Sequence, residues 1–101
     1  MFLIQILLPL TGPGQLLSEE LFRKVTDELT QRFGGVTAYT RAPAEGHWKP
    51  DSSETQRDEI VVYEVMAEKL DTVWWRDYRG KLEAQFRQQE IVVRAQEIQL
   101  L

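Results

Sequence analysis

The chain has 101 residues, of which 43% are hydrophobic and 28% are charged. This length fits one domain, 1–101, and this balance is typical of a folded globular protein. There is no cysteine, which excludes disulfides, thiolate metal sites and cysteine nucleophiles. The net charge is −4, from 12 basic and 16 acidic residues. No concentrated basic stretch of the kind that binds nucleic acid is evident, so we expect no nucleic-acid partner.

The first segment, residues 2–8, is apolar on both faces apart from Gln5. This pattern predicts a central strand that is covered on both sides. A signal peptide is the alternative, but the segment lacks a basic start and a small-residue cleavage site. It is also too short to span a bilayer, so we expect no membrane partner and a cytoplasmic location. Pro9 and residues 11–14 then predict a turn.

A first helix is predicted to begin after Ser18, whose hydroxyl can accept hydrogen bonds from free amides of the first turn. Hydrophobic residues recur at four-residue spacing and build one apolar stripe, made of Leu17, Leu21, Val25, Leu29 and Phe33. Gly34 and Gly35 follow and predict the end of the helix, because glycine takes the left-handed conformation without steric cost.

The second half of the chain predicts strands at residues 36–41, 60–67 and 91–98, with a second helix at about 71–89. The apolar stripe of that helix is Trp75, Tyr78, Leu82 and Phe86. Its basic residues alternate with acidic ones, which favours a solvated face with salt bridges over a nucleic-acid surface. The basic set is Arg76, Arg79, Lys81 and Arg87, and the acidic set is Asp71, Asp77 and Glu83.

The predicted order is βαββαβ. Two strand-helix-strand halves on one antiparallel sheet give the α+β, ferredoxin-like arrangement, a four-stranded sheet with two helices on one face. A doubly wound α/β sheet is less favoured, because the second and third strands follow one another without a helix.

Strand alternation divides the sheet residues between two faces. The set expected against the helices is Phe2, Ile4, Ile6, Leu8, Val61, Tyr63, Val65, Ile91, Val93 and Ala95. The set expected on the opposite face is Leu3, Gln5, Leu7, Thr37, Tyr39, Arg41, Val62, Glu64, Met66, Val92, Arg94 and Ile98. That face is too apolar to remain in water, so a two-fold homodimer through it is expected. In the favoured interpretation Glu64 and Arg94 form an ion pair at the dimer interface. In the alternative they line a pocket between the sheet and the loop.

The polar connection at residues 42–57 is long for a compact domain, and such loops are often functional. His47 is the only histidine and the candidate for histidine-based proton transfer. Trp48 offers an apolar wall and Arg41 an anion clamp. The simpler interpretation is that Trp48 anchors the loop and His47 faces solvent. One histidine and scattered carboxylates form no ligand set with recognisable spacing, so we expect no metal and no cofactor.

Residues 33–48, FGGVTAYTRAPAEGHW, and 58–64, DEIVVYE, carry a resemblance, with 74–79 and 91–96 fitting the same picture. They resemble a family of small uncharacterised bacterial proteins with ferredoxin-like order, a Gly-Gly-x-Thr strand entry and a Gly-x-Trp loop. The resemblance covers nearly the whole chain and implies a fold rather than an activity. More loosely, the chain is similar to the dimeric α+β barrels, which include cofactor-free monooxygenases, haem-degrading enzymes and small isomerases.

The leading functional hypothesis is a dimeric module that binds a small, anionic molecule between the open sheet face and the loop from Arg41 to Arg57. Its candidate ligand-binding residues are Tyr39, Arg41, His47, Trp48, Glu64 and Arg94. The second hypothesis is a cofactor-free enzyme of the monooxygenase or isomerase type. In it His47 or Glu64 is the general base, and Arg41 or Arg94 stabilises developing negative charge. The third is a structural domain whose loop recruits a protein partner.

Overall fold

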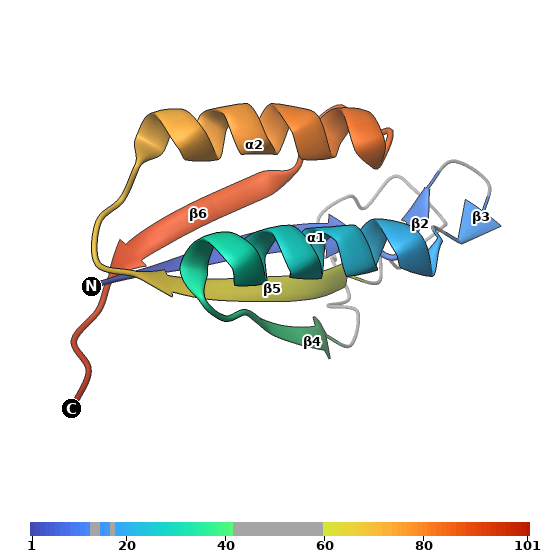
Figure 1. The fold of residues 1–101 in the computed structure, drawn as a ribbon. Helices are drawn as coiled ribbons and strands as arrows, with labels where there is room; N and C mark the ends of the chain where they lie inside the picture. The colour runs from blue at the N-terminus through green and yellow to red at the C-terminus, as the bar shows by residue number, and fades with distance from the viewer. Residues whose placement is uncertain (13–14, 17, 42–59) are drawn as a thin grey trace, which may run out of the picture.

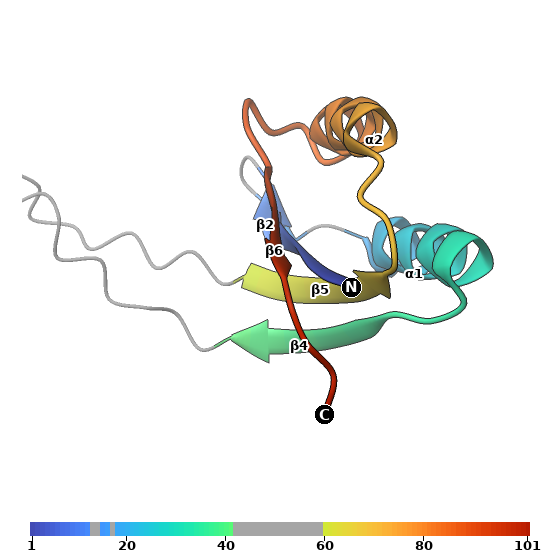
Figure 2. The same cartoon turned by 90° about the vertical axis from the view of Figure 1, so that its left-hand side faces the viewer.

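The computed structural model describes residues 1–12, 15–16, 18–41 and 60–101. Four strands form one antiparallel sheet in the spatial order β4-β5-β1-β6. They are β1 (Phe2–Pro9), β4 (Thr37–Arg41), β5 (Ile60–Ala67) and β6 (Val92–Glu97). The helices α1 (Glu19–Phe33) and α2 (Thr72–Gln85) lie on the same side of this sheet (Figure 1 and Figure 2). We call the side away from both helices the open face.

This arrangement confirms the predicted α+β, ferredoxin-like fold with the order βαββαβ. The central strand β1 pairs with β5 on one side and with β6 on the other. A two-stranded ribbon, β2 (Thr11–Gly12) with β3 (Gln15–Leu16), stands where the sequence predicts only a turn. Strands of two residues are too short to produce an alternating hydrophobic pattern, so the sequence gives no periodic signal for them.

The core lies between the sheet and the helices, and β1 supplies its centre. Ile4, Ile6 and Leu8 are fully buried, each with 0% of its surface exposed. They share one face of the strand because successive strand side chains point to opposite sides. The buried residues of the helices are Val25, Leu29, Trp75, Tyr78 and Leu82, and Phe86 at the C-cap of α2 is buried with them. The predicted stripe of α2 is therefore confirmed throughout, and that of α1 is confirmed at its two buried positions.

Aromatic rings join the end of α1 to the start of α2. The ring of Phe33 stacks on Trp75 with 5.2 Å between centroids, and it meets Trp74 edge-on at 5.4 Å. Trp74 in turn stacks on Tyr78 at 4.8 Å. The guanidinium of Arg32 lies 4.3 Å from the centroid of the Trp74 ring. Each aromatic pair contributes about 0.5–1.5 kcal/mol beyond the area it buries, so the two helices are fixed to each other as well as to the sheet.

The ends of α1 differ in how well the sequence predicts them. Ser18 is the N-cap residue, but its hydroxyl accepts no capping hydrogen bond. Its carbonyl instead accepts from the backbone N–H of Leu21 at 3.2 Å. The predicted hydroxyl cap is therefore wrong, although the position is right. Gly34 ends the helix in the left-handed conformation, with φ of 83°, as its sequence position predicts.

Helix α2 ends at Gln85, before the predicted end near residue 89. Arg87 turns the chain with φ of 53°. Its N–H donates to the carbonyl of Ala84 at 3.4 Å, and the N–H of Gln88 donates to that of Glu83 at 2.9 Å. This is the bonding pattern of a helix end that usually carries glycine at the left-handed position.

We expect Arg87→Gly to stabilise the protein. A side chain in the left-handed conformation costs about 1–2 kcal/mol, and part of that gain is offset by the greater freedom of glycine in the unfolded chain. The net gain should be about 0.5–1 kcal/mol, seen as a rise of a few degrees in Tm by calorimetry. Arg87→Ala is the control, because it removes the charge but keeps Cβ. An equal rise for both variants would contradict the strain argument.

The hydroxyl of Tyr78 is buried and has no hydrogen-bond partner within the described part of the chain. Burial raises the pKa of this phenol above its ordinary value of 10.0, and the Glu28 carboxylate and Tyr63 raise it further. The hydroxyl of Tyr63, in contrast, donates to the carbonyl of Phe22 at 3.3 Å. Two buried tyrosines of the core thus differ in whether their hydroxyl is satisfied.

We expect Tyr78→Phe to stabilise the protein by about 1 kcal/mol, because an unpaired buried hydroxyl carries an uncompensated desolvation cost. Tyr63→Phe should destabilise it by a similar amount. Above pH 10 the unfolded chain loses the Tyr78 proton while the folded chain keeps it, so stability falls as pH rises. Urea unfolding at pH 8 and pH 11 measures both effects. A Tyr78→Phe variant that loses as much stability between these pH values as the wild type would contradict the titration argument.

Candidate functional site

Four polar side chains cross the middle of the open face, one from each strand of the sheet. Gln5 on β1 lies directly opposite Glu64 on β5 and Arg94 on β6. Tyr39 on β4 lies opposite Val62, two residues from Glu64 along β5. Residues at matching register on one face of a sheet are within reach of one another. We call these four residues the polar row.

Hydrogen bonds connect the whole polar row. The amide Nε2 of Gln5 donates to Oε2 of Glu64 at 2.6 Å. The hydroxyl of Tyr39 donates to the same Oε2 at 2.9 Å, and Nε of Arg94 donates to Oε1 of Gln5 at 2.9 Å. Gln5, Glu64 and Tyr39 are half-buried, whereas Arg94 is exposed. A glutamine amide suits the middle position because it has both a donor and an acceptor to offer.

The ion pair expected between Glu64 and Arg94 at the dimer interface stays a prediction, and within one copy the two side chains do not meet directly. No hydrogen bond or ion pair of the described residues joins them, and Gln5 connects them instead. The reason is the strand order, since β1 lies between β5 and β6. Oε1 of Glu64 and the two terminal nitrogens of Arg94 make no hydrogen bond within this part of the chain. They are available to a molecule that covers the open face.

The rest of the open face is less exposed than its composition suggests. Met66 and Val92 show 52% and 46% of their surface, but Leu3 and Leu7 are half-buried. Val62 is 1% exposed and lies outside the main core cluster. The face therefore presents a half-buried apolar surface that surrounds a connected polar row.

The other predicted site residues belong to a part of the chain that the structure does not describe. His47 and Trp48 lie outside the described residues, with the rest of 42–59. The backbone of Arg41 ends β4, but its side chain also lies outside the described part. Of the six predicted ligand-binding residues, the described structure brings together Tyr39, Glu64 and Arg94, and it adds Gln5 as the link.

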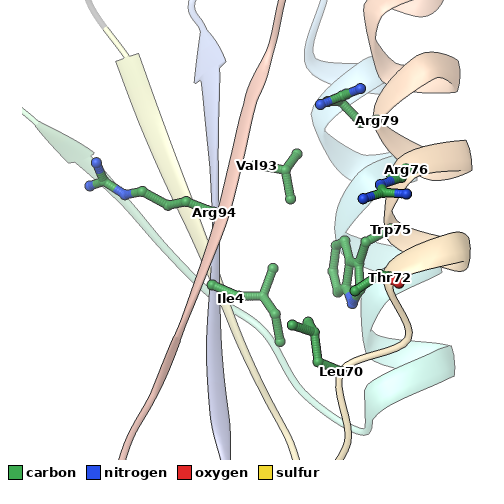
Figure 3. Close-up of a pocket in the computed structure, with 9 residues that line it drawn as sticks. Ile4, Leu70, Thr72, Trp75, Arg76, Arg79, Val93 and Arg94 are labelled. Atoms are coloured by element: carbon green, nitrogen blue, oxygen red, sulfur yellow. The ribbon is translucent and has the colours of Figure 1, made fainter.

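A cavity of about 300 Å³ lies between α2 and β6 on the helix side of the sheet. Its apolar lining consists of Ile4, Leu70, Trp75, Val93 and Ala95, and its polar lining of Thr72, Arg76, Arg79 and Arg94. Figure 3 shows Ile4 and Val93 pointing toward the helix, while the head of Arg94 points away from it. Arg76 and Arg79 stand one above the other along α2, with Arg76 near the Trp75 ring (Figure 3). No carboxylate is among these described lining residues.

The predicted salt bridges do not form at these two arginines. The carboxylate of Asp71 accepts from the backbone N–H of Trp74 at 3.1 Å, so it serves as the N-cap of α2. Glu83 accepts from the backbone N–H of Ile91 at 2.9 Å. Both carboxylates are thus used by the backbone, and within the described residues Arg76 and Arg79 make no ion pair.

The hydrophobic and charge patterns of the sequence do not predict this cavity, although one signal for it is present. Arg76 and Arg79 are three residues apart and so lie on one helix face, and Trp75 beside them belongs to the core stripe. Acidic residues alternate with these arginines in the sequence, which predicts salt bridges. The sequence does not show, however, which group each carboxylate binds. Only Lys81 of the predicted basic set has an ion pair in the described part, with Glu28 of α1 at 2.7 Å.

Comparison with protein-family models, with curated proteins and with solved structures finds no match to this chain. The resemblance to the small bacterial family therefore stays a prediction. Among the described residues, no helix is long and apolar enough to cross a bilayer. In the same part of the chain, no group of three histidine or acidic side chains is placed to hold a metal ion.

We expect Gln5→Leu to destabilise the protein by about 1–2 kcal/mol, because it removes two hydrogen bonds to charged partners, the half-buried Glu64 and the exposed Arg94. Gln96→Leu is the matched control. Gln96 lies on β6 on the same face as Gln5, is exposed and makes no hydrogen bond within the described part of the chain. Urea unfolding of both variants measures the difference. Equal stability of the two variants would show that the polar row contributes nothing to the fold.

Proposed function

We propose that this protein is a non-catalytic binding module that works as a symmetric homodimer, with two copies joined through their open faces. The observation that supports this proposal is the order of charge along the polar row. Glu64 and Arg94 are both register partners of Gln5, on opposite sides of it. They therefore lie at the same height along the strands and one strand to either side of β1.

Because of this order, the charges of two open faces are complementary when the two-fold axis runs in one particular direction. An axis that runs along β1, midway between two stacked sheets, carries β5 of one copy over β6 of the other. Glu64 then faces Arg94 of the partner subunit, and the reverse pair forms by symmetry. An axis that runs across the strands would instead place Glu64 over its own copy, which like charges disfavour.

The hydrogen-bonding groups that the polar row does not use fit this dimer arrangement. Stacked sheets lie about 10 Å apart, a gap that an arginine and a glutamate side chain can bridge. Within the described part of the chain, the terminal nitrogens of Arg94 are unused donors and Oε1 of Glu64 is an unused acceptor. Met66 and Val92, the exposed apolar residues of this face, would be covered at the same time, which adds a hydrophobic contribution.

The expected ligand site between the open face and the loop stays a prediction, because 42–59 lie outside the described residues. Two of the four candidates of the enzyme hypothesis, His47 as base and Arg41 as charge stabiliser, have side chains outside the described residues. The other charge stabiliser, Arg94, is bonded to Gln5. The other candidate base, Glu64, already accepts two hydrogen bonds at Oε2. This use of Glu64 as a structural acceptor favours the binding module over the enzyme.

A charge exchange tests the dimer. Arg94→Glu brings two carboxylates together at each of the two pairs across the interface. Glu64→Arg brings two guanidinium groups together at the same places. Each single variant should weaken dimerisation by about 2–5 kcal/mol for every broken pair. The double variant should recover it, because both pairs are restored with their signs exchanged. The Gln5 amide can turn over to serve both new neighbours.

Sedimentation velocity at micromolar concentration measures the oligomeric state of the four proteins. Arg23→Glu, a change of the same charge at an exposed position of α1, is the control and should leave the dimer intact. A monomeric wild type would contradict the proposal. So would a double variant that stays monomeric while circular dichroism shows it to be folded.

A further inference from the structure

We propose that the cavity between α2 and β6 binds a small amphiphilic anion, a molecule with one carboxylate or phosphate head and a short apolar body. Arg76 and Arg79 bind the head, and the apolar floor of the cavity holds the body. This site lies on the helix side of the sheet, so it is distinct from the open face and independent of the dimer.

The charge of the cavity is the first part of the argument. The protein carries a net charge of −4, yet the described lining of this cavity on the helix side carries the guanidinium groups of Arg76 and Arg79 and no carboxylate. Arg76 and Arg79 lie one helical turn apart, where like charges destabilise a helix slightly. Neither has an ion-pair partner in the described part of the chain. An anion between them removes this repulsion, and guanidinium groups bind carboxylate and phosphate in the bidentate manner.

The floor of the cavity is the second part. Ile4 and Trp75 are 0% and 5% exposed, and with Leu70 and Val93 they form an apolar surface below the two cations. The indole N–H of Trp75 makes no hydrogen bond within the described residues, which leaves one further donor beside Thr72 (Figure 3). A bare inorganic ion would contact only the two guanidinium groups and leave the apolar part of the lining unused. A molecule that carries both an anionic head and an apolar body matches both parts of the lining.

The size of the cavity limits the size of the ligand, and the position of Arg94 limits which side chains can bind the head group. About 300 Å³ is at the lower end of the range for small-molecule sites, so the apolar body is short. Arg94 supplies little to the head group, because its side chain points to the opposite face of the sheet (Figure 3) and its Nε is bonded to Gln5. The two arginines of α2 therefore carry the recognition of charge.

Isothermal titration calorimetry with defined probes tests the site. Octanoate and octyl phosphate carry both the anionic head and the apolar body. Octanol carries the apolar body alone, and acetate and inorganic phosphate carry the anionic head alone. We expect at least one of the two amphiphilic anions to bind about tenfold more tightly than octanol and than its own head group. Nuclear Overhauser contacts between the methylenes of the bound probe and the Trp75 ring would locate it.

Two variants separate the parts of the site without touching the core. The double variant Arg76→Gln/Arg79→Gln should weaken binding of the amphiphilic anion about tenfold or more. Its matched control is Arg23→Gln/Lys24→Gln, which removes two exposed positive charges from α1 and should leave binding unchanged. Ala95→Phe fills the cavity from the exposed edge of β6, where an aromatic residue suits a strand, and should abolish binding.

Three results would overturn the proposal. The first is that neither octanoate nor octyl phosphate binds. The second is that neither amphiphilic anion binds more tightly than octanol, or that the two double variants lose binding equally, which would remove the role of Arg76 and Arg79. The third is binding that persists in a folded Ala95→Phe variant, which would place the probe elsewhere.

Discussion

The alternation of side chains along β1 is the constraint on which the rest of the structure depends. Ile4, Ile6 and Leu8 point into the core and are fully buried, so the residues between them must face the opposite side. Gln5 is therefore held in the middle of the open face by the burial of its neighbours. A shift of one residue in the register of β1 would bring the glutamine amide into the core, where its desolvation would be costly. The same packing that builds the core thus places the polar row.

The helices depend on a second contact, the aromatic cluster between the end of α1 and the start of α2. Because Phe33 contacts both Trp74 and Trp75, the start of α2 is anchored to α1, and Trp75 is held as the floor of the cavity. The arginines of α2 follow from this placement. When Trp75 faces the core, Arg76 and Arg79 must lie at the side of the helix that borders β6. The cavity is accordingly a result of where α2 is fixed.

The sequence predicts the helices, the strands and the two sheet faces because all of them depend on the spacing of hydrophobic residues along the chain. That spacing can be read from residue types alone. The stripe of Trp75, Tyr78, Leu82 and Phe86 is one example, and the bounds of β5 are another. The site is predicted less well because it depends on pairing. Nothing in the sequence says that β1 separates Glu64 from Arg94, or that Glu83 turns to the backbone of Ile91. The α2 end at Gln85 was also missed, since the left-handed residue there is an arginine.

The polar row also has a gradient of local stability built into it. Its centre, Gln5, lies on a strand that is paired on both sides, whereas Arg94 and Tyr39 lie on β6 and β4, which form the two edges of the sheet. Edge strands open at a lower free energy than central ones, so their amides exchange hydrogen sooner. The row should therefore loosen from its ends while the glutamine stays in place. The central bond to Glu64 then serves as the template on which the outer two bonds form again after each opening.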